Sequence, residues 1–255
     1  MGTSDGKGHR DRIALPVIRR NDIVEGGVGD DTIDGGSGDD TFIVEGSSQD
    51  GDVYNGGEGM DTILGGTGDD TVKLSQFDGS NSIEVIDGGA GTNIIAGNSS
   101  INNLDFSDTT LINISLIEGK GADDTIIGSA GDDVIEGDGG DDALYGGSGL
   151  DILWGQGGSD TFVFENASAF NNIDVIKDFS TSQDDAIDIA ELLTAYDPMT
   201  DILSDFVQIT DDGTDSTLAV DADGGADNFL TIATIEGITG LTDEQLMVDN
   251  NQLIV

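Results

Sequence analysis

Large apolar residues recur at every ninth position in two blocks of the chain, residues 26–73 and 119–163. The second block is five nine-residue units without a gap: GKGADDTII, GSAGDDVIE, GDGGDDALY, GGSGLDILW and GQGGSDTFV. The eighth position of each unit is a large apolar residue, which suits a three-residue strand that turns one side chain inward. The glycines of the first positions allow backbone conformations that other residues resist, so this part predicts a turn.

One such strand buries a single apolar group, so one unit cannot be stable alone. Stacked units can bury a continuous core, and two units would form one coil of about 18 residues. Successive coils would lie ~4.8 Å apart. A flexible Gly- and Asp-rich linker is the alternative, but five units in register disfavour it. The pattern predicts an all-β, parallel solenoid.

The sixth position of the units is aspartate in both blocks. The first block has complete units at 26–43 and 56–73, and between them a three-residue insertion and a degenerate unit, 47–55. We expect coil-to-coil pairing of Asp31 with Asp52, Asp40 with Asp61, and Asp52 with Asp70. The position-six residues are Asp31, Asp40, Asp52, Asp61, Asp70, Asp124, Asp133, Asp142, Asp151 and Asp160.

Stacking places these carboxylates in columns, where they repel one another unless a cation lies between them. Carboxylate and carbonyl oxygens without nearby His or Cys favour calcium over zinc or copper. The chain has 52 acidic and 8 basic residues, a formal net charge of −44. Without counterions such a chain should be expanded, so we expect folding to be coupled to metal binding. The charge also argues against nucleic acid and anionic lipid as partners.

The units G-G-x-G-x-D-x-U-x resemble the calcium-binding repeats of RTX proteins. The resemblance implies a right-handed parallel β-roll in which each calcium ion lies between units n and n+2, bound by two aspartates and by backbone carbonyls. In the first block the implied carbonyl ligands are Gly27, Gly29, Gly36, Gly38, Gly56, Glu58, Gly65 and Thr67. In the second block they are Lys120, Ala122, Ser129, Gly131, Gly137, Asp138, Gly139, Gly140, Gly146, Ser148, Gly155 and Gly157. We expect roughly six to twelve ions.

Residues 74–118 interrupt the repeats, and Asn93 stands where an aspartate is expected. We expect a metal-poor continuation of the solenoid here, with strands at 83–87 and beyond 103. Residues 104–119 resemble segments of large bacterial RTX adhesins. The expected core residues are Leu104, Phe106, Leu111, Ile112, Ile114 and Leu116.

Residues 164–255 lack the repeat and predict a cap over the last coil. We expect strands at 174–179 and 186–189, an antiparallel set at 206–210, 216–221 and 228–235, and one or two short helices. The helices would lie at 191–195 and after a capping box of Thr242 and Gln245. Asp174, Asp178, Asp185 and Asp188 would suit one more ion, but solvation at the surface is the simpler interpretation.

This C-terminal part resembles the target domain of type I secreted RTX proteins, through D-T-F-V-F at 160–164, D-V-I-K-D-F at 174–179, D-A-I-D-I at 185–189 and the closing L-I-V. The resemblance implies export by a type I secretion apparatus of a Gram-negative bacterium to the medium or cell surface. Residues 1–20 hold five of the eight basic residues, and we interpret them as a disordered arm or a foreign extension. They contain no apolar segment typical of Sec export, and no run in the chain predicts membrane insertion. The chain has no Cys.

Catalytic motifs are missing from the sequence. The single histidine, His9, excludes an H-E-x-x-H site and disfavours a Ser-His-Asp triad, and there is no G-x-S-x-G elbow. We therefore expect a monomeric, non-catalytic module at the C-terminus of a secreted RTX adhesin, unfolded without calcium. The alternative is an accessory domain of a secreted protease, lipase or alginate epimerase. Binding of ice or polysaccharide on a flat face is disfavoured, because position three is irregular.

Overall fold

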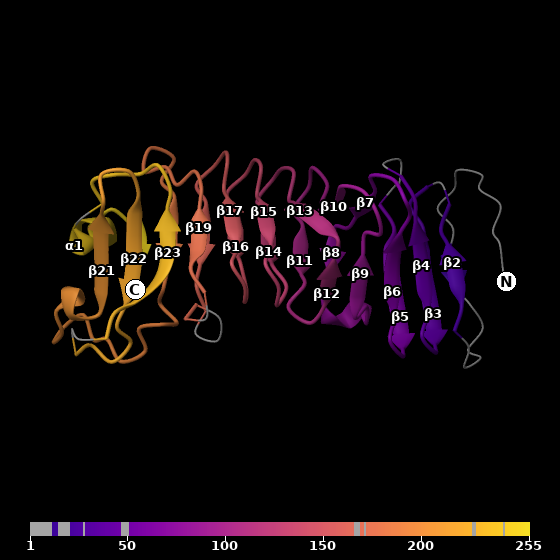
Figure 1. Ribbon diagram of the computed structural model, residues 1–255, viewed down its shortest axis with the longest axis horizontal. Coiled ribbons are helices and arrows are strands. Elements are labelled where there is room, and N and C mark those ends of the chain that lie inside the picture. Colours follow the sequence, from indigo (N-terminus) through magenta and orange to yellow (C-terminus); the bar gives the residue numbers. More distant parts are fainter. Residues whose placement is uncertain are drawn as a thin grey trace. The chain divides into compact units, whose positions relative to one another are not determined.

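The computed structural model describes residues 12–14, 21–27, 29–46, 51–165, 169–170, 172–225, 228–241 and 243–255. Figure 1 shows that short strands dominate the described residues, which include one α-helix and two 3-10 helices. The chain divides into two compact units, residues 1–121 and 122–255. Both are parallel solenoids, so the all-β fold class predicted from the sequence is confirmed.

The first unit begins with coils of two strands. One parallel sheet contains β1 (Arg12–Ala14), β3 (Thr32–Ser37) and β5 (Val53–Glu58). The other begins with β2 (Ile23–Glu25), β4 (Thr41–Val44) and β6 (Thr62–Gly65). Register partners such as Thr32 and Val53, or Thr41 and Thr62, are offset by one 18-residue coil plus the three-residue insertion. The expected pairing of Asp31 with Asp52, and of Asp40 with Asp61, is confirmed.

From residue 66 the coils of this unit contain three strands. β9 (Val85–Asp87) and β12 (Thr110–Ile112) extend the sheet of β6, while β7 (Thr71–Lys73), β10 (Asn93–Ala96) and β13 (Ile114–Glu118) form another. A third face pairs β8 (Gln76–Phe77) with β11 (Asn103–Asp105), and η1 (Gly79–Asn81) follows β8. Since β5 and β7 lie in different sheets, the predicted pairing of Asp52 with Asp70 is wrong.

The core of the first unit takes the inward side chains of successive strands, including Phe42, Ile63 and Ile86 at 0% exposure. In the three-stranded coils Leu104 and Phe106 are buried as predicted, and Phe106 stacks on Phe77 with ring centroids 5.1 Å apart. Leu111, Ile112, Ile114 and Leu116 are not fully buried, so their assignment to the core is wrong. Alternation along β13 turns Ile117 inward instead, at 1% exposure.

The second unit keeps two strands per coil and an offset of 18 residues. β14 (Thr125–Ile127), β16 (Ala143–Tyr145) and β18 (Thr161–Val163) form one parallel sheet, and β15 (Val134–Glu136) pairs in parallel with β17 (Ile152–Trp154) in the other. The middle residue of each strand is the predicted eighth position and is at most 1% exposed. These residues are Ile126, Ile135, Leu144, Leu153 and Phe162.

Coiling continues beyond the last recognisable repeat. β19 (Asp174–Ile176) pairs in parallel with β17, and β20 (Ala186–Asp188) with β18. β23 (Leu230–Ile235) then pairs in parallel with β19, and β24 (Leu253–Ile254) with β20. The predicted antiparallel set is confirmed as β21 (Val207–Asp211), β22 (Ser216–Val220) and β23.

Two helix predictions in this region need correction. Residues 191–195 form successive turns closed by bonds such as Leu192 N–H to the Ile189 carbonyl, and the 3-10 helix η2 lies later, at Leu203–Asp205. The predicted C-terminal helix is present as α1 (Glu244–Asp249), but its N-cap is Asp243, whose side chain accepts from the Leu246 N–H. Thr242 lies outside the described residues. In the described part of the chain, no helix combines the length and apolar character that crossing a membrane requires.

Candidate metal sites

The ten position-six aspartates are buried, with exposures of 8% or less. In the regular repeats the backbone N–H of one aspartate donates to Oδ1 of the aspartate one coil later. The N···O distances are 2.7 Å from Asp124 to Asp142 and 2.9 Å from Asp133 to Asp151. The same bond joins Asp40 to Asp61 at 2.7 Å. The strands therefore hold the carboxylates in ordered ladders, as the repeat predicted.

The second oxygen of several of these carboxylates is buried without a hydrogen-bond partner in the part of the chain that the structure describes. Burying an ionised carboxylate oxygen without compensation is costly, so each such atom marks a place for a cation. In the repeats this oxygen packs against the first glycine of its own unit: a Cβ on Gly146 would meet Asp151 Oδ2 at 2.5 Å. The atoms include Oδ2 of Asp40, Asp61, Asp142, Asp151 and Asp160.

The turns beside these carboxylates share an alternating backbone conformation. Positions two and four are left-handed, as in Gly147 (φ 92°) and Gly149 (φ 140°). Lys120, Ala122 and Asp138 adopt the same conformation although they are not glycine, with φ of 86°, 76° and 72°. Alternation of this kind turns successive peptide groups in different directions, so that backbone carbonyls can face an ion beside the carboxylates.

Two units close their turns differently. Asp70 Oδ2 accepts from the Gly66 N–H at 2.7 Å, and Asp133 Oδ2 accepts from the Ser129 N–H at 2.6 Å and the Ser129 hydroxyl at 2.9 Å. In these two units the residues at positions two and four do not have positive φ. They are Gly66, Gly68, Ser129 and Gly131. The implied ligands Ser129, Gly131 and Thr67 thus lie in turns where a local donor already satisfies the carboxylate.

Burial changes the acidity of the column carboxylates. It raises the pKa of Asp151 to about 8, of Asp160 to about 7 and of Asp142 to about 6. Backbone N–H donors oppose this effect, while neighbouring carboxylates, Asp174 and Asp133 in the case of Asp151, add to it. A cation would relieve both the burial and the repulsion.

Sequence reasoning missed three members of the columns: Asp174, Asp185 and Glu84, whose Oε2 accepts from the Asp61 N–H at 2.7 Å. Asp174 and Asp185 are 6% and 1% exposed, so the predicted solvation is wrong for both. Asp174 Oδ1 accepts from the Asp151 N–H and Asp185 Oδ1 from the Asp160 N–H, each at 3.1 Å. The available signal was their place two residues before a buried isoleucine, as position six stands two before position eight. These two bonds span 23 and 25 residues instead of 18, and these insertions together with the lack of glycine obscured the register.

The other two aspartates of that region have local roles. Asp178 accepts from the N–H groups of Gly155 and Gln156 at 3.0 and 2.8 Å, and Asp188 accepts from the Ala190 N–H at 2.9 Å. These bonds fix turns between coils and do not continue the ladder.

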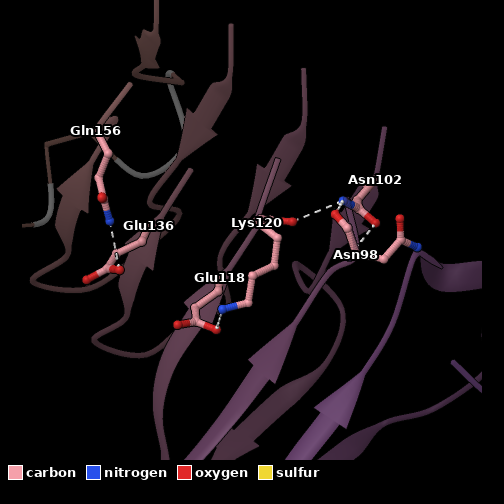
Figure 2. Close-up of polar contacts among 7 residues, drawn as sticks. Asn98, Asn102, Glu118, Lys120, Glu136 and Gln156 are labelled. Carbon is pink, nitrogen blue, oxygen red and sulfur yellow. Dashed lines mark hydrogen bonds and ion pairs between the residues drawn. The ribbon is translucent and has the colours of Figure 1, made fainter. Parts of the chain in front are cut away.

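Amides replace carboxylates in the three-stranded coils. Asn93 Oδ1 accepts from the Asp70 N–H at 2.9 Å, and its Nδ2 donates to the Asn113 carbonyl at 3.1 Å. Asn102, fully buried, donates to the Asn98 carbonyl (Figure 2). It also donates to the Gly119 carbonyl at 3.1 Å. An amide supplies both an acceptor and a donor, so these positions are satisfied without a cation.

The residue before the column aspartate forms a second ladder that the sequence analysis did not assign. Asp123 Oδ1 accepts from the Asp141 N–H at 3.0 Å, and Asp132 Oδ1 from the Leu150 N–H at 2.9 Å. Here the carboxylate belongs to the earlier coil, so this ladder runs opposite to that of position six. The frequent Asp-Asp pair of the repeat was the signal for it.

The oxygen ligands available at these sites fit calcium. The described residues contain no group of three or more His, Cys, Asp or Glu side chains placed to hold a metal ion. Each candidate site offers two carboxylates, such as Asp142 and Asp160, and must complete its shell with backbone carbonyls and water. Calcium accepts such all-oxygen shells, whereas zinc sites use nitrogen and sulfur ligands from side chains.

Comparison with known families agrees with this chemistry. The family model described as RTX calcium-binding nonapeptide repeat (4 copies) matches residues 19–46, 48–75, 78–104, 118–153 and 142–166, about half of the chain. A search of curated proteins gave no match. Repeat register, buried carboxylate ladders and family match agree, and the chain belongs to the family of RTX calcium-binding nonapeptide repeat proteins.

Proposed function

We propose that this chain is a non-catalytic, calcium-dependent folding and type I secretion module of a secreted RTX adhesin. The observation that carries the proposal is the set of buried, unpartnered carboxylate oxygens, exemplified by Oδ2 of Asp142 and Asp160. Without a cation these oxygens oppose folding, and with calcium they become ligands. The calcium concentration would therefore decide whether the chain folds.

Charge supports a switch between two states. A net charge of −44 expands the metal-free chain, and each calcium ion bound in a coil cancels two negative charges. In the calcium-poor cytosol the chain would stay unfolded and able to pass through a secretion channel. In calcium-rich medium it would fold, which favours export in one direction.

The secretion role and the adhesin context rest on resemblance. RTX repeats are typical of proteins exported by type I systems, and residues 160–189 and the last three residues resemble the C-terminal target region of such proteins. Residues 104–119 resemble segments of large adhesins. The single histidine, His9, and the use of paired aspartates in ladders support a non-catalytic role.

Circular dichroism of the whole chain tests the folding part. Chelated protein should give a coil spectrum, and calcium addition should restore a strand spectrum with binding of roughly six to twelve ions. A chain that is fully folded after metal removal, with no change on adding calcium, would refute the proposal.

Export needs its own assay in a cell that carries a type I apparatus. The full chain should appear in the medium, and a version lacking residues 164–255 should remain inside. Retention of the full chain, or equal export of both, would contradict the secretion role and leave the calcium-dependent folding to be judged by the spectra.

A further inference from the structure

A groove of about 500 Å³ lies in the second unit where β15 and β17 end. Glu136 and Trp154 are register partners at the last positions of these two strands. Trp154 is half-buried and is the single tryptophan of the chain. The groove is lined by Glu136, Trp154, Gln156, Gly157 and Asp178.

Hydrogen bonds hold the polar lining in place. The Gln156 side chain reaches back across the coil and donates from Nε2 to Glu136 Oε2 at 2.9 Å, as Figure 2 shows. Asp178 holds the backbone below it through the N–H groups of Gly155 and Gln156. Gln156 itself has a left-handed backbone, with φ of 64°. The Gln156 carbonyl accepts from Gln183 Nε2 at 2.9 Å, which fixes this turn further.

The charges of the lining have one sign. Its two ionisable side chains, Glu136 and Asp178, are carboxylates, and among the described residues no basic side chain lines the groove. Lys177, the neighbour of Asp178 in sequence, forms an ion pair with Glu236. An indole beside carboxylates attracts a cation through both the ring face and the charge. Anionic ligands are disfavoured for the same reasons, and all the more by the net charge of −44.

We propose that this groove binds an organic cation, an ammonium or guanidinium group held between the Trp154 ring and the carboxylate of Glu136. Basic peptides and small amines both present such a group. The site uses side chains that calcium binding does not, so it goes beyond the folding and export role and is independent of it.

Fluorescence of Trp154 in the calcium-saturated full chain tests the proposal, because no other tryptophan contributes. N-acetyl-arginine amide and spermidine should change the emission saturably, with dissociation constants in the millimolar range. N-acetyl-glutamine amide and glucose, which are neutral, should not. Saturating calcium keeps the ion sites filled, so the change cannot arise from folding.

Two charge-matched variants separate a built site from general attraction to an acidic protein. Glu136→Gln removes one lining charge and should weaken binding of both cations about tenfold. Glu191→Gln removes one charge from an exposed residue outside the groove and should leave the affinity unchanged. An equal response to the neutral probes, or equal weakening by both variants, would overturn the proposal.

Discussion

The backbone N–H of Asp133 donates to Oδ1 of Asp151 at 2.9 Å, while Oδ2 of Asp151 is buried with no partner among the described residues. One carboxylate thus has two separate tasks. Its first oxygen aligns two coils without metal, and its second oxygen requires a cation. The two tasks can be separated by mutation, because an amide can perform the first and lacks the charge for the second.

Asp151→Asn should therefore keep the coil and lose metal. The chain contains its own precedent, since Asn93 accepts the corresponding N–H at 2.9 Å in a buried ladder position. We expect the variant to bind at least one calcium ion fewer in a calorimetric titration and to fold at a higher calcium concentration. Asp151→Ala, which also loses the ladder bond, should cost about 1 kcal/mol more in the calcium-loaded state. Unchanged stoichiometry in Asp151→Asn would contradict the assignment of Oδ2 as a ligand.

The reverse exchange, Asn93→Asp, tests the metal-poor segment. It places a charge where Asn93 Nδ2 now donates to the Asn113 carbonyl at 3.1 Å. At the lowest calcium concentration that folds both proteins we expect destabilisation of about 2–4 kcal/mol, because a donor is lost and a buried charge is added. Saturating calcium should recover part of this loss if the neighbouring Asp70 can share an ion. Denaturant unfolding at the two calcium concentrations measures both effects, and a stability equal to wild type at the lower concentration would contradict this account.

The repeating parts of the fold could be predicted because each position of the repeat keeps one residue type with one structural role. Position eight predicted the core in every strand from β14 to β18, and position six predicted the ladders. The three-stranded coils between residues 66 and 118 were not predicted, since their length varies and no nine-residue period marks their corners. Asp174 and Asp185 were missed for a related reason: an insertion shifts their register, and their turns lack glycine. A ladder residue is defined by its partner in the next coil, so it can be assigned only when the residues of that coil are known.

Raising the pH should lower the stability of the metal-free protein and increase its affinity for calcium. The pKa of Asp151 is raised by burial to about 8 and that of Asp160 to about 7, above the ordinary value of 3.8. The folded metal-free state therefore binds more protons than the unfolded chain between about pH 4 and pH 8, and its stability should fall as pH rises through this window. Calcium needs the ionised carboxylates, so its affinity should rise over the same window.

Circular dichroism of metal-depleted protein at pH 5 and pH 8 checks the first half, with more strand signal expected at pH 5. Calcium titration at the two values checks the second half, with proton release on binding. Metal-free stability that increases with pH would show that these carboxyls are not protonated in the folded state.

Glycine at position four should be required where coils stack closely. Gly140 has φ of 139°, and a Cβ there would overlap the carbonyl of Ala122. Gly140→Ala should therefore destabilise the calcium-loaded protein by about 2–4 kcal/mol through strain and displacement of a carbonyl that lines a candidate site. Gly139→Ala is the matched control, because its nearest neighbour would be the Gly157 carbonyl at 3.8 Å. Equal effects of the two substitutions in calcium-dependent unfolding would contradict a requirement set by stacking.

The position-five ladder should stabilise the coils whether or not metal is bound. Asp132 Oδ1 accepts from the Leu150 N–H at 2.9 Å, and the acceptor belongs to the earlier coil, unlike the position-six bond between Asp133 and Asp151. The two bonds therefore join the same pair of coils in opposite directions, one with the acceptor in the earlier coil and one with the acceptor in the later coil. Asp132→Ala should lower the free energy of unfolding by about 1 kcal/mol, while Asp132→Asn keeps an acceptor and should lose less.

Calcium stoichiometry should stay unchanged in both Asp132 variants, in contrast to Asp151→Asn, because the position-five carboxylate is exposed at the edge of the turn and uses its oxygen on the backbone. Denaturant unfolding combined with a calcium titration separates the two ladders. A loss of bound calcium in Asp132→Asn would mean that position five is itself a ligand. It would contradict the assignment of calcium binding to position six alone.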